Sequence, residues 1–428
     1  MKMMLGTGKA DITPPYPVPL AGFSERRDVY EGVARPLYVR VWLFEQDSDA
    51  AVERRQALII QADLIWWGTG HVEAIKRSIQ AKWGISPEHV FFHASHTHGG
   101  PQTTSEFNPL VGVMAPAYLN DLERAVEQAI ADAHLNVEAV TMEKGSVICE
   151  GIGISRRRIV NGAAQFAPNP DGLNDNEVTV IRCLTEDGRM KGLLFHFTCH
   201  PTITNANWVT SEYCGAAMEL LDREWGDGVS CFLQGCCGDI RPSLHKEGSF
   251  YRGDEGDIAN SGAQLSAAVN RILTQPMTRL EPARIEGWIT QVELPFRPLP
   301  FAEYGMEESE VAEAWKAMQQ TGSSSQKDSS VLCMQLLKLA DGLALIGMNG
   351  EMVVEYGVWI KREADGRILP LGYSNGMIGY VPTAAQIEEG GYESVTSGYV
   401  FGYPAPFASD VESRIKEALH ILIGHVRA

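Results

Sequence analysis

The sequence lacks the long apolar stretches of a membrane-spanning protein. No run of about 18 apolar residues occurs in its 428 residues, although 44% of them are hydrophobic. The opening MKMMLGTGKADITPP also lacks the roughly 7 to 15 apolar residues and the small-residue cleavage site of a secretory signal. We therefore expect a cytoplasmic protein with no membrane insertion.

Cysteine is scarce, and its spacing excludes the common cysteine frameworks. The chain has eight cysteines, and the adjacent pair Cys236 and Cys237 is the closest approach to a C-x-x-C motif. The other six stand singly in apolar contexts. We expect neither a zinc finger nor a disulfide framework.

Positive charge is also in deficit. The chain has 36 Lys and Arg against 54 Asp and Glu, which gives a formal net charge of -18. Such an excess of negative charge disfavours nucleic acid or an anionic membrane surface as a partner. We expect a small-molecule substrate, and the sequence leaves a homo-oligomer open.

The residues that are present predict an α/β fold. Apolar, β-branched runs alternate with segments of helical period. We expect mixed sheets flanked by helices in one large catalytic domain over residues 1–428, with a more strand-rich part after Pro282 that includes a hairpin turning at Asp341-Gly342. We expect residues 321–330, TGSSSQKDSS, to form a surface loop. The expected strands are 56–67, 89–95, 192–200, 229–235 and 283–296, and the expected helices are 71–84, 117–135, 211–225, 258–273 and 408–426.

Three of the 11 histidines fall within VFFHASHTHGGP at residues 90–101. We interpret His93, inside the apolar run, as a core residue. His96 and His98 are two residues apart and would face one side if the strand ran that far. Open α/β sheets bind ligands at the carboxyl ends of their strands. By itself, H-x-H is compatible with a metal site and with two surface histidines in a loop.

Other segments also place a polar group after an apolar run. GLLFHFTCH ends in His200, LALIGMNGE ends in Glu351, and GMIGY ends in Tyr380. Two histidines and a carboxylate with an open position are typical of catalytic zinc, which lowers the pKa of bound water to about 7. The same ligands accept manganese, iron or cobalt. Neither HExxH nor HxHxDH occurs in the chain.

These segments resemble the neutral/alkaline ceramidase family over nearly the whole chain. GTGKADITPP at 6–15 is similar to the family's opening segment, QADL at 61–64 to its S-A-D-L, and HTHGGP at 96–101 to its H-T-H-S-G-P. GEMVVEYG at 350–357 resembles its G-E-x-T, and GYVPT at 379–383 its Y-V/I-T-T. Tyr392 follows Tyr380 by twelve residues, as a second tyrosine does in the family.

The resemblance implies a set of site residues. His98 would lie beside the metal or face the substrate, where a neutral histidine carries a proton to the leaving amine. Tyr392 and Arg156 would stabilise the developing oxyanion. The implied zinc ligands are His96, His200, Glu351 and Tyr380.

Two departures from the family pattern bear on the substrate. GDIRPS at 238–243 places Arg241 where the family has a serine, which excludes that serine as a nucleophile. A guanidinium matches a carboxylate or phosphate, so Arg241 is a candidate substrate-binding residue. The alternative is a structural ion pair with Asp239 or another carboxylate. The chain also ends soon after the helix at 408–426, so we expect no immunoglobulin-like C-terminal domain of the kind in full-length ceramidases.

Three functions are compatible with these residues. We favour a zinc-dependent amidohydrolase that cleaves an amide, lactam or ester bond of a small polar metabolite, because a cytoplasmic enzyme without a basic surface is poorly suited to extract a lipid. The first alternative is a ceramidase that cleaves N-acyl sphingosine and has a deep apolar groove beside the metal. The second is a non-catalytic metal-binding scaffold.

Overall fold

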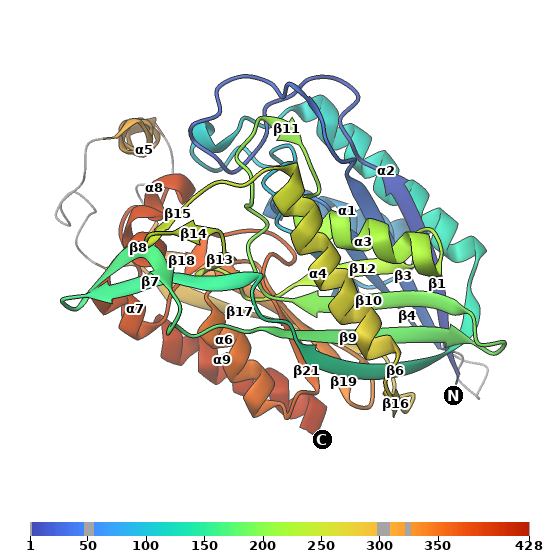
Figure 1. Ribbon diagram of the computed structural model, residues 1–428. Helices are drawn as coiled ribbons and strands as arrows, with labels where there is room; N and C mark the ends of the chain where they lie inside the picture. Colours follow the sequence, from blue (N-terminus) through green and yellow to red (C-terminus); the bar gives the residue numbers. More distant parts are fainter. Residues whose placement is uncertain (1, 47–54, 298–308, 322–326, 428) are drawn as a thin grey trace.

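A nine-stranded mixed sheet lies at the centre of the computed structural model (Figure 1). The structure describes residues 2–46, 55–297, 309–321 and 327–427. In these ranges the strand order is β12-β10-β9-β6-β1-β3-β4-β5, with β16 paired to β6. The β4–β5 and β10–β12 pairs are parallel and the others antiparallel. The strands are β1 (Met3–Asp11), β3 (Tyr38–Gln46), β4 (Arg55–Ala62), β5 (Val90–Ala94), β6 (Glu138–Ile148), β9 (Glu177–Thr185), β10 (Met190–Phe197), β12 (Ser230–Gln234) and β16 (Thr278–Leu280).

The central sheet packs against a second, four-stranded sheet in the order β17-β18-β19-β21. Alternation along β3 explains the two-sided core, because successive side chains point to opposite faces of a strand. Trp42 and Phe44 join Leu345 in the apolar cluster between the sheets. Val41 and Leu43 join the cluster that the helices cover. The second sheet consists of β17 (Glu286–Pro295), β18 (Ser329–Ala340), β19 (Leu343–Met348) and β21 (Ile368–Leu371).

Helices cover the outer face of each sheet (Figure 1). The central sheet is covered by α2 (Pro116–Leu135), α3 (Glu212–Trp225) and α4 (Glu255–Leu273), and the second sheet by α6 (Val354–Glu363) and α9 (Val411–Arg427). The chain therefore forms a layered α/β/β/α arrangement. The other elements used below are α1 (Thr69–Trp83), α5 (Glu310–Thr321), α7 (Ala384–Glu389), α8 (Gly398–Phe401), a π-helical turn at Tyr392–Thr396, β7 (Gly153–Val160), β8 (Ala163–Asn169), β13 (Ile240–Pro242), β20 (Glu351–Met352) and β22 (Tyr380–Val381).

The predicted α/β class with mixed sheets is confirmed, and the five expected helices correspond to α1, α2, α3, α4 and α9. The predicted hairpin is β18–β19, and Gly342 in its turn has φ 81. Two strand ends were wrong: β4 ends at Ala62 rather than at 67, and β10 ends at Phe197 rather than at 200. β5 ends at Ala94, one residue before its predicted end. Half of the predicted loop at 321–330, residues 322–326, lies outside the described residues, whereas Thr321 ends α5 and residues 329 and 330 begin β18. Within the described ranges, no helix has the length and apolar character needed to cross a bilayer.

The two edge strands of the central sheet approach each other at their carboxyl ends. His93 of β5 is fully buried, as predicted, and its Nε2 accepts a hydrogen bond from the backbone N–H of Gln234 in β12 at 2.7 Å. Burial lowers the pKa of His93 to about 3, so this imidazole is neutral. The hydrogen bond brings the loops that follow β5, β10 and β12 to one place.

The contact between β1 and α2 provides a test of this packing. A Cβ added to Gly8 would lie 1.9 Å from the carbonyl oxygen of Ala129 in α2. We expect Gly8→Ala to lower the free energy of unfolding by roughly 1–3 kcal/mol, because overpacking forces the helix away from the sheet. Gly70→Ala is the matched control, since nothing lies within 4 Å of its added Cβ, and we expect no loss of stability. Urea unfolding measures both variants, and equal losses would contradict the prediction.

Candidate metal centre

His96 reaches the site through a turn and not through a strand. The chain leaves β5 at Ala94, and His96 adopts a left-handed backbone with φ 68. Its ring is fully buried, and Nδ1–H donates to the carbonyl oxygen of Ile65 at 2.8 Å. The strand therefore does not run far enough for strand alternation to align His96 with His98, although the two rings do meet.

His200 is fixed by the same kind of contact. It lies three residues after β10, and its Nδ1 lies 2.6 Å from the carbonyl oxygen of Cys237 and 2.8 Å from that of Ile240. When Nδ1 carries the hydrogen, the lone pair is on Nε2, which is the form that binds a metal ion. Burial, and then the charge of Arg156, lower the pKa of His200 to about 4, so the ring is neutral near pH 7.

Glu351 and Tyr380 face each other across a short parallel pair of strands. They are register partners in β20 and β22, and both are buried. Each begins its strand and neither closes an apolar one, which corrects the prediction that they lie at strand ends. The backbone N–H of Glu351 donates to the carbonyl oxygen of Gly379 at 2.8 Å, which fixes the two strands beside each other.

The polar atoms of these residues have the spacing of ligands around one cation. Oε2 of Glu351 lies 3.3 Å from Nε2 of His96 and 3.3 Å from Nε2 of His200. The hydroxyl of Tyr380 lies 3.3 Å from Nε2 of His200. Four ligands at about 2.0–2.1 Å from one tetrahedral zinc ion are themselves roughly 3.3–3.4 Å apart. The four residues implied by the family resemblance therefore come together and fit a zinc ion.

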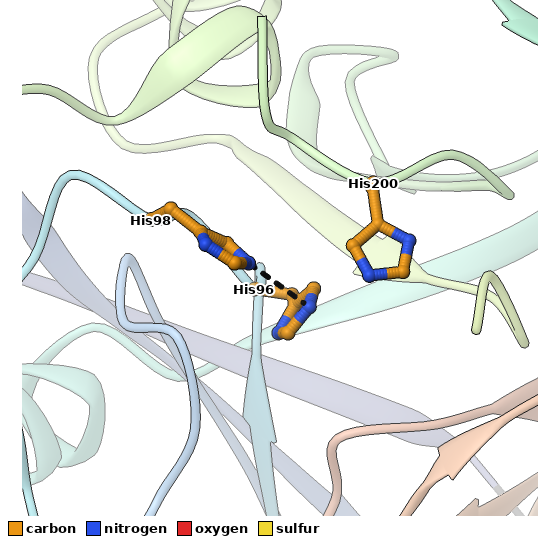
Figure 2. Close-up of side chains that lie close together, drawn as sticks. All are labelled: His96, His98 and His200. Atoms are coloured by element: carbon orange, nitrogen blue, oxygen red, sulfur yellow. Dashed lines mark hydrogen bonds between the residues drawn. The ribbon is translucent and has the colours of Figure 1, made fainter. Parts of the chain in front are cut away.

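His98 also belongs to this cluster (Figure 2). Its Nε2 lies 3.4 Å from Nε2 of His96, and the ligand nitrogens of His96, His98 and His200 all lie within 4.8 Å of one another. Nδ1 of His98 is buried without a hydrogen-bond partner in the described part of the chain. The ring packs against Gly22, where an added Cβ would lie 2.2 Å from this atom. The geometry allows His98 to be a fifth ligand or a proton carrier beside the other four residues.

The charges of the cluster suit a bound cation. Burial opposes ionisation of Glu351, but the neighbouring His96 and His200 outweigh it and hold the pKa of this carboxyl well below its usual range. Burial, followed by the proximity of His96 and His200, lowers the pKa of His98 well below its ordinary value. The cluster therefore offers the carboxylate of Glu351 and the neutral imidazoles of His98 and His200 at pH 7, which is the protonation state that a divalent metal needs.

A buried ion-pair network surrounds Tyr380. Arg156 donates to the hydroxyl of Tyr380 at 3.0 Å, to the carbonyl oxygen of Gly238 at 2.6 Å and to Glu393 at 2.7 Å. Arg157 donates to the other oxygen of Glu393 at 2.6 Å. Nε and one terminal nitrogen of Arg156 already donate hydrogen bonds to protein atoms. The direct action of Arg156 on an oxyanion therefore stays a prediction.

A cavity of about 770 Å³ opens beside the histidines. His98, His200, Glu351 and Tyr380 line it, and its walls also include the aromatic residues Phe23, Trp66, Tyr399 and Phe401. Tyr392 lies on the same wall, with its ring centroid 5.3 Å from that of Tyr380, and burial raises its pKa to about 12. Its hydroxyl is therefore a hydrogen-bond donor at neutral pH. Arg241 also lines the cavity.

Two residues of the site were missed from the sequence. Tyr373 stacks on His96 with ring centroids 3.9 Å apart, and its hydroxyl lies 3.5 Å from Oε2 of Glu351. It follows the apolar strand β21, so the signal that drew attention to His200 was also present here. Glu393, which holds Arg156, had no such signal because it lies in a polar segment and its two arginine partners are more than 230 residues away in sequence.

Comparisons with known proteins agree with this geometry. The sequence profile of a family described as "Neutral/alkaline non-lysosomal ceramidase, N-terminal" matches residues 3–271. The structure of neutral ceramidase from Pseudomonas aeruginosa matches all of this chain and 75% of its own, with a TM-score of 0.78 and 19% identity. A structure described as a ceramidase complexed with C2 matches with the same coverage and TM-score at 18% identity. These likenesses show the neutral ceramidase fold.

Glu351 provides the direct test of the centre. We expect Glu351→Ala to lose zinc, because its carboxylate contacts two of the other ligands and supplies the negative charge of the cluster. Metal content after dialysis, measured by mass spectrometry, should fall from about one ion per chain to a trace. Glu355→Ala, an exposed glutamate four residues later, is the control and should keep its zinc. Full zinc in Glu351→Ala would remove Glu351 from the ligand set.

Proposed function

This chain belongs to the neutral/alkaline non-lysosomal ceramidase family, and we propose that it is a zinc-dependent enzyme that hydrolyses the amide bond of an N-acyl compound. The family is one of amide hydrolases, so the chain is a hydrolase. The observation that carries the proposal is the set of 3.3 Å separations among His96, His200, Glu351 and Tyr380 at the wall of a large cavity. We also propose that residues 1–428 form one catalytic domain and that the protein is cytoplasmic.

Zinc held by His96, His200, Glu351 and Tyr380 would supply Lewis-acid chemistry and lower the pKa of a water molecule to about 7. His98 is suited to move protons, because its neutral ring lines the cavity with Nε2 directed at the cluster. It would accept a proton at Nε2 from the attacking water and donate it to the nitrogen of the leaving amine.

Tyr392 would stabilise the negative charge that develops on the carbonyl oxygen. Its hydroxyl remains protonated at neutral pH and lines the same cavity. A donor fixed before the reaction stabilises this charge without having to reorganise. Arg156 holds the hydroxyl of Tyr380, which packs against Tyr392, so we assign Arg156 a positioning role next to its predicted electrostatic one.

Family membership supports a substrate of the ceramidase kind more strongly than the small polar metabolite that the sequence favoured. The aromatic walls formed by Trp66, Tyr399 and Phe401 agree with it, because they offer an apolar surface to an acyl chain. The hydrolysis of a small polar metabolite remains the second candidate, since Arg241 lines this cavity as well. A non-catalytic scaffold has less support, because such a protein needs no open cavity beside its metal.

Amine release measures the proposed reaction. We expect the zinc-loaded protein to hydrolyse N-acyl sphingosines or simpler N-acyl amines, to lose this activity on chelation and to regain it with zinc. A series of short, medium and long acyl chains separates the two candidate substrates, because only the lipid reading predicts a rise in kcat/KM with chain length. No turnover of any N-acyl compound by fully loaded protein would leave the scaffold reading in place.

Replacing His98 separates a proton carrier from a ligand. We expect His98→Gln to lower kcat by about 10²–10⁴ and to keep one zinc ion per chain, because four ligands remain. The measurements are initial rates and metal content on the same samples, with His245→Gln, an exposed histidine outside the cavity lining, as the control. If zinc is lost together with activity, His98 is a ligand and another group must carry the proton.

A further inference from the structure

Arg241 projects from the short strand that also fixes His200. Arg241 lies in β13, opposite Ile154 of β7. The carbonyl oxygen of the preceding residue, Ile240, accepts hydrogen bonds from the backbone N–H of His200 at 3.1 Å and from Nδ1 of the same histidine at 2.8 Å. The guanidinium is therefore held in a fixed relation to the metal centre and lines the same cavity.

No acceptor in the described part of the chain satisfies this guanidinium. Arg241 is 6% exposed, and its Nε is buried without a hydrogen-bond partner. The structural ion pair with Asp239 is not formed, because Asp239 accepts from the backbone N–H of Val354 at 2.8 Å and from Nε2 of Gln386 at 2.9 Å. The same described ranges contain no other carboxylate in an ion pair with Arg241. A buried cation without a partner is costly unless a ligand supplies the missing charge.

The surroundings of Arg241 leave the N–H groups of its guanidinium available to an anion. Its guanidinium stacks on Phe250 at 4.3 Å and lies 5.6 Å from the ring of Phe166, so its flat face is occupied while its N–H edge remains unpaired. Arg252 lines the same cavity from a more exposed position and stacks on Phe23 at 4.4 Å. Burial, with Arg252 and Arg156 nearby, lowers the pKa of Arg241 to about 9, and it is still charged at neutral pH.

The carboxylates that line the cavity do not neutralise this corner. Glu351 belongs to the metal cluster, and Glu389 is bound to Arg157 at 2.9 Å. Glu25 is exposed, accepts from Nδ2 of Asn205 at 3.1 Å and, with Glu212, acts on Arg252 and not on Arg241. The charged neighbours of Arg241 are therefore arginines, in a protein whose net charge is -18.

We propose that Arg241, assisted by Arg252, forms a subsite for an anionic group of the substrate, a carboxylate or a phosphate attached on the amine side of the scissile amide. The inference rests on the proposed function for the identity of the reacting bond. A guanidinium edge binds such a group through two parallel charge-assisted hydrogen bonds. The enzyme would thus distinguish an anionic N-acyl compound from a neutral one of the same chain length.

Three substrates with one acyl chain test this specificity. They are an N-acylglycine with a carboxylate, an N-acylethanolamine phosphate, and the neutral N-acylethanolamine. We expect the zinc-loaded wild-type protein to show at least about tenfold higher kcat/KM for one or both anionic compounds, because two charge-assisted bonds are involved. Arg241→Gln should remove the preference, because it lowers kcat/KM for the anionic compounds much more than for the neutral compound. The anionic compound that is preferred identifies the carboxylate or the phosphate as the ligand.

Binding of inert analogues tests the subsite without turnover. In matched ketones, a methylene replaces the amide nitrogen of the N-acylglycine and of the N-acylethanolamine, and calorimetry with the zinc-loaded protein gives their affinities. We expect the ketone acid to bind at least about tenfold more tightly than the ketone alcohol to the wild type, and equally to Arg241→Gln. If the wild type shows this difference in affinity but hydrolyses no amide, the subsite is supported and the proposed function is rejected.

Control variants keep the test decisive. Arg158→Gln, which removes a charge from the adjacent strand β7 outside the cavity lining, should keep the anion preference. If Arg241→Gln does not fold, as judged by circular dichroism, Arg241→Lys should lower the preference because an ammonium cannot form the two parallel bonds. Equal affinity of the wild type for both ketones, or an unchanged preference in the Arg241 variants, would overturn the subsite.

Discussion

The hydrogen bonds from Nδ1 of His96 and His200 to backbone carbonyls determine the rest of the site. They leave Nε2 of each ring as the free acceptor and direct both lone pairs at one oxygen of Glu351. The carbonyls belong to Ile65, after β4, and to Ile240 in β13, so the orientation of the imidazoles is set by the backbone of two neighbouring segments. Because those segments are buried and hydrogen-bonded themselves, the fold fixes the orientation of the two rings.

The arginine network stabilises the other half of the centre. Glu393 binds both Arg156 and Arg157, and Arg156 passes this constraint to Tyr380. Removing these charges from water is expensive, and their mutual attraction repays the cost only when the geometry and the remaining hydrogen bonds are good. Here each charged group has several partners, so β7, β22 and the π-helical turn at Tyr392–Thr396 are held together. Arg241 differs from Arg156 in this respect, because no carboxylate in the described part of the chain pairs with its guanidinium.

Much of the fold could be predicted from the sequence because its signals are local. The helical period of α2 and the alternation along β3 are visible in short windows, since one side of each element contacts a core. The packing of two sheets was not visible, because β-strands that are apolar on both faces carry no mark of what covers each face. The sequence left open whether the strand runs on to His96 and His98, and only the left-handed backbone of His96 reveals the turn.

For the site, the sequence by itself determined which residues are available: two histidines in H-x-H, a histidine after an apolar strand, and a glutamate and tyrosine in segments that resemble one family. The tertiary structure decided the tautomers of His96 and His200, the partners of Arg156 and the lack of a partner for Arg241. It also brought Tyr373 and Glu393 into the site. The physical reason is that ligand spacing and ion pairing depend on distances between segments far apart in the chain, and no local periodicity encodes those distances.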